Sequence, residues 1–205
     1  MPRRVDTEQQ RTDIAHAVWR LAARAGLEAV SLREVAAEAG VSMGRVQHYF
    51  RTKEEMLLHG LRLALGRMED RISGRLRHRS SADAEDVLRS ALEEMVGGDQ
   101  DTRQAIRVCV AFYPRALEDP HVADLLFGDD DVLHALAADV VRAAQADHRA
   151  APELDPDQEA RVLWSVVNHL GTEVAFHRLP PDQARATLRY HLDRVLGPRP
   201  DTAPA

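Results

Sequence analysis

Residues 40–53 read GVSMGRVQHYFRTK, and this stretch decides how the chain is interpreted. Val46 and Phe50 are four positions apart, which places both on one face of a helix. The remaining positions are mostly polar or carry an aromatic ring with a polar tip. Gly44 lies inside the predicted helix, although an interior glycine costs about 1 kcal/mol relative to alanine. Such a helix buries little, which indicates that its outer face contacts something outside the chain.

Strong local signals bound the helices around this stretch. Ser31 with Glu34 forms an S-x-x-E capping box, so a helix is predicted to begin at residue 32. Gly40 is expected to end that helix after about two turns, since glycine accepts the left-handed backbone of a helix terminus. Ser42 then caps the next helix, and a second capping box at residues 52–55 opens a long one.

Two short helices joined by a tight turn at Gly40 are typical of a helix-turn-helix, whose second helix enters the major groove of DNA. Arg45 can bond guanine and Gln47 adenine, each through two hydrogen bonds. Gly44 would let the backbone approach a base or phosphate closely. The types of three nearby side chains suit phosphate contacts, namely His48, Tyr49 and Lys53.

Composition places the chain among globular proteins. It has 205 residues, of which 44% are hydrophobic and 29% charged, and no apolar run approaches the roughly 18 to 20 residues that span a bilayer. The N-terminal residues lack the apolar core of a secretory signal, so we expect a cytoplasmic protein with no membrane partner. Arg3 and Arg4 form either an arm that reaches DNA or a frayed end.

Charge is unevenly distributed along the chain. Residues 1–53 carry nine Lys or Arg against six Asp or Glu, whereas the remainder carries 18 against 27. A polyanion should therefore be bound by the N-terminal part alone. The arginine-rich residues 71–80 are interpreted as a solvated face or a hinge.

Helical periodicity runs through nearly the whole chain, and no convincing strand pattern is present, so the predicted fold class is all-α. We expect a DNA-binding domain over residues 1–52, a helical domain over 53–197 and a disordered tail over 198–205. Helices are predicted at residues 7–25, 32–39, 43–49, 53–79, 83–96, 100–118, 121–148 with a break at the GDDD run, 156–178 and 181–196.

Residues 31–57, SLREVAAEAGVSMGRVQHYFRTKEEML, resemble the DNA-binding domain of the tetracycline-repressor (TetR) family of transcriptional regulators. The family signature A-G-V-S-x-G-x-x-x-x-Y-F-x-x-K is present from Ala39 to Lys53. The resemblance implies base contacts from Arg33, Met43, Gly44, Arg45 and Gln47, and phosphate contacts from Ser31, Ser42, His48, Tyr49 and Lys53. Arg45 and Gln47 depart from the residues common in the family, so no relative's operator sequence is carried over.

The resemblance also implies a homodimer whose C-terminal domain binds a small-molecule effector. Apolar and small residues at helical spacing give independent support for a dimer interface, although the same stripes fit a core within one chain. The predicted interface residues are Trp164, Val167, Gly171, Val174, Ala175, Leu188, Leu192, Val195 and Leu196. The predicted effector-binding residues, mostly scarce large aromatics, are Cys109, Phe112, Tyr113, Phe127, Trp164, Asn168, His169 and Phe176.

The preferred interpretation is therefore a repressor that binds a near-palindromic operator as a dimer and is released by an effector. No catalytic residue, cofactor or metal is predicted. Two alternatives stay open: an all-α metal-dependent enzyme using His169, Glu173 and His177, and a helical scaffold that binds DNA without sequence preference. Cys109 has apolar neighbours, which favours a buried thiol over a redox sensor.

Overall fold

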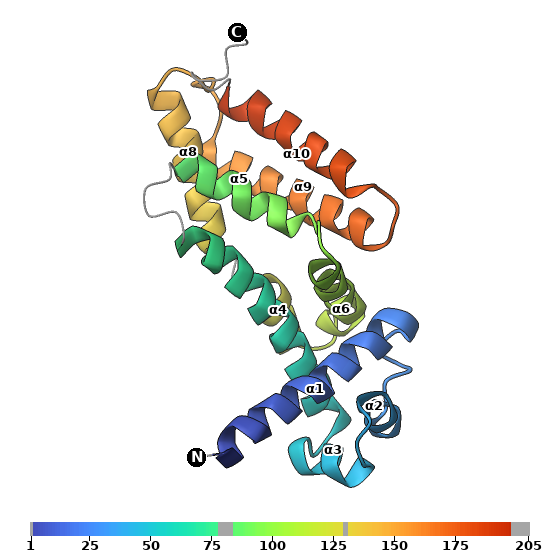
Figure 1. Cartoon of the computed structure of the whole chain (residues 1–205). Coiled ribbons are helices and arrows are strands. Elements are labelled where there is room, and N and C mark those ends of the chain that lie inside the picture. Colours follow the sequence, from blue (N-terminus) through green and yellow to red (C-terminus); the bar gives the residue numbers. More distant parts are fainter. Residues whose placement is uncertain (1, 78–83, 129–130, 198–205) are drawn as a thin grey trace. The chain divides into compact units, whose positions relative to one another are not determined.

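The computed structural model describes residues 2–77, 84–128 and 131–197, and every regular element in these ranges is an α-helix (Figure 1), which confirms the all-α class. The predicted tail over residues 198–205 lies outside the described part. In chain order the helices are α1 (Pro2–Ala25), α2 (Leu32–Ala39), α3 (Met43–Tyr49), α4 (Lys53–Arg77), α5 (Ala84–Met95), α6 (Gln100–Ala116), α7 (Pro120–Phe127), α8 (Asp131–Ala146), α9 (Pro156–Ala175) and α10 (Pro181–Leu196).

Most predicted helix ends lie within two or three residues of the observed ones, and the exceptions have physical causes. Helix α1 begins at Pro2 rather than residue 7. Within residues 121–148, the break predicted at the GDDD run is confirmed, because α7 ends at Phe127 and α8 begins at Asp131. Helix α9 ends at Ala175 rather than 178 because His177 has a left-handed backbone (φ 56°) and the Arg178 amide donates to the Glu173 carbonyl at 2.8 Å. This is a Schellman ending with histidine where glycine is usual.

The chain divides into two compact units, each of which makes most of its contacts within itself. Unit 1 comprises Met1–Glu69 with Gln104–Gly128, and unit 2 comprises Asp70–Arg103 with Asp129–Ala205. Helices α4 and α6 each contribute residues to both units. The division predicted after residue 52 separates a DNA-binding domain from an effector-binding domain. It does not coincide with the boundary between the two compact units, and it stays a prediction.

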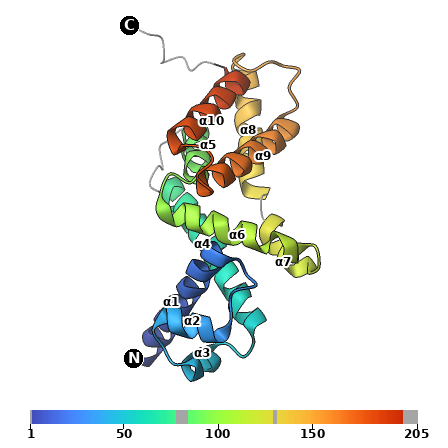
Figure 2. The same cartoon turned by 90° about the vertical axis from the view of Figure 1, so that its right-hand side faces the viewer.

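Unit 1 is built on the helix-turn-helix. Helices α1, α2 and α3 lie together at one end of the chain (Figures 1 and 2), and the first part of α4 packs with them. Trp19 on α1 donates from Nε1 to the Gly60 carbonyl on α4 at 2.7 Å. A Cβ at Gly60 would lie 3.1 Å from Val18, so a glycine here permits the close approach of α1 and α4. Fully buried side chains from five elements join this core: Val18, Val35, Val46, Leu57 and Phe112.

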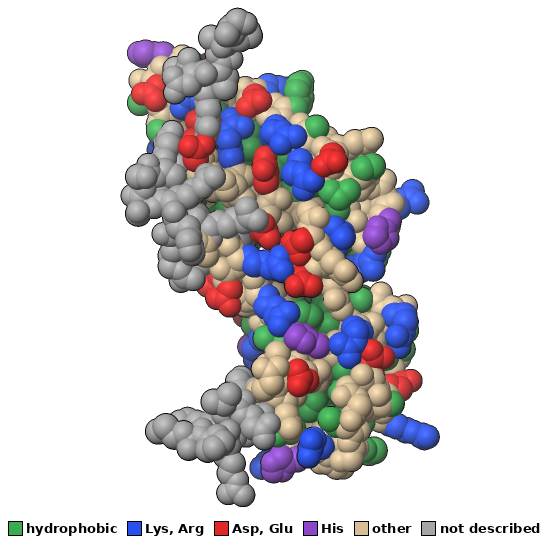
Figure 3. All heavy atoms as spheres, in the orientation of Figure 1, with side chains coloured by type: hydrophobic (Ala, Val, Ile, Leu, Met, Phe, Trp, Pro, Cys, Tyr) green, Lys and Arg blue, Asp and Glu red, His purple; other side chains and the backbone are tan. Residues whose placement is uncertain are grey.

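Unit 2 is a layered group of α5, α8, α9 and α10, which lie side by side in both ribbon views (Figures 1 and 2). Leucines and valines at helical spacing fill its core, as the amphipathic pattern of these helices predicts. Basic and acidic side chains are interspersed over the face of this unit seen in Figure 3.

A buried ionic cluster closes one end of unit 2. The Glu85 carboxylate on α5 is 3.1 Å from Arg149 and 2.9 Å from Arg89. Arg89 also pairs with Asp193 on α10 at 2.9 Å, and Arg149 donates to the Leu196 carbonyl at 3.1 Å. The cluster therefore ties the start of α5, the segment after α8 and the end of α10 together.

Arg71, the first residue of the 71–80 run, is the centre of a second ionic cluster. The side chains of most of that run lie outside the described part, so its interpretation as a solvated face or a hinge stays a prediction. The Arg71 guanidinium is 2.7 Å from Asp99, 3.0 Å from Asp101 and 3.3 Å from Glu94. Burial opposes ionisation of Asp99, but hydrogen bonds from Thr102 and the Arg71 charge together hold the Asp99 pKa well below its ordinary value of 3.8. The last turns of α4 are thereby fixed to the start of α6.

Over the described ranges, the structure contains no helix that is both long and apolar enough to cross a membrane.

Candidate nucleic-acid interface

Helix α2 is positioned by its two ends. The Ser31 hydroxyl oxygen accepts a hydrogen bond from the Glu34 amide at 3.2 Å, as the capping box predicts. Gly40 follows the helix with φ 67°, and the Val41 amide donates to the Ala36 carbonyl at 3.0 Å. The left-handed glycine turns the chain at once into the next cap, which fixes α3 beside α2.

Helix α3 is held by its ends and by one buried face. The Ser42 hydroxyl oxygen accepts from the Arg45 amide at 3.2 Å. Val46 and Phe50 have no exposed surface, whereas the opposite face is open, with Met43 46% exposed. This confirms the predicted core pair. The exposed residues of α3 are Met43, Gly44, Arg45, Gln47 and His48.

Gly44 is not required by the fold. A Cβ built on it would meet no atom of the chain within 4 Å, and its backbone is not in the left-handed region. The fold would therefore tolerate a side chain at this position, and the glycine leaves room for close approach to the start of α3.

The predicted phosphate-contacting side chains are held by partners within unit 1. The Tyr49 hydroxyl donates to Gln10 Oε1 on α1 at 2.9 Å, and its ring is 5.2 Å from the His48 ring in an edge-on arrangement. Lys53 Nζ is 3.5 Å from the Glu28 carbonyl. Ser31 and Ser42 accept cap hydrogen bonds, but each hydroxyl hydrogen stays available to donate to a phosphate oxygen.

Sequence reasoning missed the part that α1 plays in orienting α3. Gln10 bonds Tyr49, and the Arg11 guanidinium lies over the Phe50 ring at 5.3 Å from its centre. These residues are about 39 positions from their partners, so no local pattern marks them. Purple and blue side chains, histidine and basic residues, lie over the α3 end of unit 1 in Figure 3.

One acidic side chain of α2, Glu38, is paired with two arginines of α1. A hydrogen bond from Arg20 lowers the pKa of Glu38, with Arg24 adding to the effect at 3.4 Å. Arg33, predicted to contact a base, is exposed on the same helix.

The predicted effector-binding residues belong to two separate groups. In unit 1, Phe112 is fully buried, and the exposed Tyr113 and Phe127 rings pair at 5.6 Å. Burial raises the pKa of the Cys109 thiol to about 12, so the thiol stays protonated at neutral pH. In unit 2, the Trp164 ring is half-buried 5.6 Å from His134, while the exposed side chains are Asn168, His169 and Phe176.

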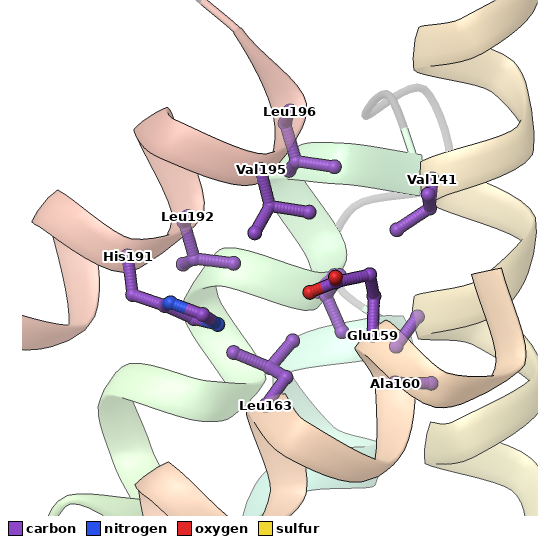
Figure 4. A pocket seen from close by; sticks show the side chains of 10 residues that line it. Val141, Glu159, Ala160, Leu163, His191, Leu192, Val195 and Leu196 are labelled. Carbon is purple, nitrogen blue, oxygen red and sulfur yellow. The ribbon is translucent and has the colours of Figure 1, made fainter. Parts of the chain in front are cut away.

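Unit 2 also contains a pocket that none of these residues lines (Figure 4). It lies among α5, α8, α9 and α10 and is small, with room for about one water molecule. Two of its side chains, Glu159 and His191, are polar. Aliphatic residues complete the walls: Leu88, Ala137, Val141, Ala160, Leu163, Leu192, Val195 and Leu196.

The residues predicted for a dimer interface pack inside unit 2 instead. Eight of the nine are buried within the single chain, and Trp164 is half-buried. This burial supports a core within one chain, the alternative that the pattern also allowed, and leaves little surface of these side chains for a second copy. The buried residues are Val167, Gly171, Val174, Ala175, Leu188, Leu192, Val195 and Leu196.

The histidine and glutamate set proposed for a metal is not assembled on one helix. His169 Nε2 is 3.9 Å from Glu173, but His177 lies beyond the end of α9. In the described part of the chain, no three His, Cys, Asp or Glu side chains are grouped to hold a metal ion.

The exposed face of α3, held on a capped two-helix unit, defines a helix-turn-helix DNA-binding protein. Comparison with known proteins gives the particular family. Residues 14–59 match the model of bacterial regulatory proteins of the tetR family, and residues 84–197 match the model of the BetI-type transcriptional repressor C-terminal domain. The chain belongs to the TetR family and is a DNA-binding transcriptional regulator.

Individual relatives cover nearly the whole chain. The HTH-type transcriptional regulator PksA of Bacillus subtilis is 28% identical over 95% of this chain and 94% of its own. The regulator BetI of Burkholderia thailandensis is 30% identical over 97% of this chain and 100% of its own. A transcriptional regulator from Saccharomonospora viridis, solved in complex with choline, aligns with a TM-score of 0.77 at 25% identity, covering 91% of this chain and 96% of that one.

Proposed function

We propose that the chain binds a near-palindromic DNA operator as a homodimer, represses transcription there and is released by a small-molecule effector. One observation carries the DNA-binding part. Helix α3 exposes Arg45 and Gln47, while Val46 on the same helix is fully buried. The buried residue holds the helix in place, and the exposed side chains are accessible to DNA bases. The TetR-family relatives support the same role.

Within this proposal the exposed residues divide by chemistry. Side chains that present planar or paired hydrogen-bonding groups read bases, and those with hydroxyl, imidazole or ammonium groups contact phosphates. The proposed base contacts are Arg33, Met43, Gly44, Arg45 and Gln47, and the proposed phosphate contacts are Ser31, Ser42, His48, Tyr49 and Lys53.

A dimer would use the outward sides of α9 and α10, because their inward sides are buried. Val162 on α9 is 47% exposed and Tyr190 on α10 is 70% exposed, so both offer apolar surface to a second copy. Paired helices from two copies would then form a four-helix interface.

For an effector to release the protein from DNA, it must bind more tightly to one of two arrangements of the DNA-binding domains in the dimer. This preference shifts the population away from the arrangement that binds DNA. Helix α4 is the proposed lever, because it supplies residues to both units and its last turns are fixed by Arg71. The relative solved with choline makes choline the first effector to test.

Selection of binding sites from random DNA tests the proposal. We expect a palindromic consensus with half-sites one helical turn, or a multiple of it, apart. Recovery of DNA without any consensus would instead support the non-specific scaffold.

Arg45→Ala and Lys53→Ala should weaken operator binding in different ways. Arg45→Ala should relax preference at one base pair, at a cost of about 1 to 3 kcal/mol. Lys53→Ala should weaken all sequences alike and reduce the dependence of affinity on salt. Binding isotherms on matched and mutated operators measure both effects, with Arg161→Ala, exposed in unit 2, as the control. Unchanged base preference in Arg45→Ala would remove its reading role.

A further inference from the structure

Arg11 on α1 is a basic side chain that lies against the end of α3. Its guanidinium carbon is 5.3 Å from the centre of the Phe50 ring, and Phe50 is the residue that follows α3. Arg11 is half-buried, and its Nε is buried without a hydrogen-bond partner. Among the residues whose side chains the structure describes, no carboxylate forms an ion pair with it. A charged donor that loses water without gaining a partner is unfavourable, so a partner from outside the chain would compensate.

Two other arginines of α1 differ from Arg11 in this respect. Arg20 and Arg24 both pair with Glu38 of α2, Arg24 at 3.4 Å. Glu38 therefore offsets part of the positive charge on the second half of α1, whereas Arg11 has no acidic partner in the described part of the chain. Because both are arginines on one helix, Arg24 is a matched comparison for Arg11.

The position of Arg11 in unit 1 indicates what the outside partner is. The preceding residue, Gln10, accepts a hydrogen bond from the Tyr49 hydroxyl at 2.9 Å. In both ribbon views the N-terminal end of α1 lies at the end of unit 1 that α3 occupies (Figures 1 and 2). Tyr49 and Lys53, one on each side of Phe50 in the sequence, are proposed phosphate contacts. A DNA strand bound by both would pass the end of α3, where the Arg11 guanidinium lies.

We infer that Arg11 donates hydrogen bonds to a phosphate of the operator backbone, in addition to the phosphate contacts proposed above. The inference rests on the proposed function, because it requires a duplex bound at α3. A guanidinium can bond a phosphate through two N–H groups at once, and the Phe50 ring against which it lies favours the cation. Since every nucleotide carries a phosphate, this contact adds affinity without distinguishing sequences.

Binding of the full chain to a selected operator duplex at several salt concentrations tests this inference, with fluorescence anisotropy as the measurement. Arg11→Gln should weaken binding about tenfold at low salt, the scale of a lost charge-assisted hydrogen bond. The slope of log affinity against log salt should fall in magnitude by about 0.9, because one phosphate contact fewer releases fewer counterions. The order of preference among operators with single base changes should stay the same.

Arg24→Gln is the matched control, since it removes the same charge from the same helix. Its affinity should stay within about threefold of that of the natural chain, the scale of an exposed ion pair, and its salt slope should be unchanged. Equal loss of slope in both variants would reduce the effect to net charge and overturn the inference. An Arg11→Gln variant that folds, as circular dichroism reports, and keeps the full slope overturns it as well.

NMR of the natural chain supplies a readout that does not depend on the folding of a variant. The guanidinium N–H signals of Arg11 should shift when the operator is added, and those of Arg24 should not. No shift at Arg11 would contradict the contact. Failure of the chain to bind any duplex would instead overturn the proposed function, whereas operator binding with an undiminished salt slope in Arg11→Gln would overturn the Arg11 contact alone.

Discussion

Glu85 is an acidic residue inside an apolar unit, with 3% of its side chain exposed. Burying a carboxylate is unfavourable unless charged partners and hydrogen bonds compensate, and here Arg89 and Arg149 both do so. Because the two arginines are held in turn by Asp193 and the end of α10, this single residue organises one end of unit 2.

Glu85→Ala should therefore lower the free energy of unfolding by about 3 kcal/mol, since it leaves buried arginine charge without its partner. Glu93→Ala on the same helix is the matched control. Glu93 is 38% exposed and 3.4 Å from Arg189, so its loss should cost less than about 1 kcal/mol. Urea denaturation compares the two variants, and equal losses would contradict the proposed importance of burial.

Asp99 should make stability sensitive to acid. Its pKa is lower in the folded chain than in the unfolded one, so its contribution is complete above the ordinary value of 3.8 and is lost as the pH falls below it. Asp99→Asn should destabilise the chain at neutral pH, and the difference from the natural chain should shrink as the pH falls through 3.8 toward the folded-state pKa. Unfolding followed at several pH values measures this. A difference independent of pH would show that the Asp99 charge has no part.

At the scale of elements, the helix-turn-helix contains two glycines that differ in what the fold requires of them, Gly40 after α2 and Gly44 in α3. Gly40 has φ 67°, which the turn between the helices requires, whereas Gly44 has an ordinary helical backbone and open space where a Cβ would stand. The turn therefore requires the first, and we propose that the second lets DNA approach the start of α3 closely.

Gly40→Ala should lower the stability of the chain by about 1 kcal/mol because alanine is strained in the left-handed region. Gly44→Ala should keep or slightly raise stability, since alanine favours helix, yet weaken operator binding. Thermal unfolding and binding isotherms separate the two. If Gly44→Ala bound the operator as well as the natural chain, close approach at this position would be disproved.

The helix-turn-helix was predictable because its determinants are local. Ser31, Ser42 and Gly40 act on amides and carbonyls within five residues, so the chain order itself displays them. The hydrogen bond between Tyr49 and Gln10 and the ion pairs of Arg71 join distant segments, and no spacing rule marks them. The apolar stripes of α9 and α10 were visible, but a stripe does not reveal whether its own chain or a second copy covers it.

At the scale of the whole molecule, the proposed dimer interface is formed by the outward faces of α9 and α10. Tyr190→Glu places a charge on the proposed dimer face and should convert the dimer into a monomer with weaker operator binding. Leu117→Glu is the control, since Leu117 is 89% exposed and belongs to unit 1, whereas the proposed dimer face belongs to unit 2. Analytical ultracentrifugation reports the mass of each variant. A Tyr190→Glu variant that stays dimeric would place the interface elsewhere.

The sharing of α4 and α6 between the two compact units bears on chimeric regulators. A cut after residue 52 would separate the helix-turn-helix from Met56, Leu57 and Leu61, which have no exposed surface in its core, and from Phe112 of α6. A helix-turn-helix domain transplanted with this cut would lack part of its hydrophobic core. Grafting a new operator preference onto this scaffold is better done by exchanging the exposed residues of α3 alone, since these contribute nothing to the interior.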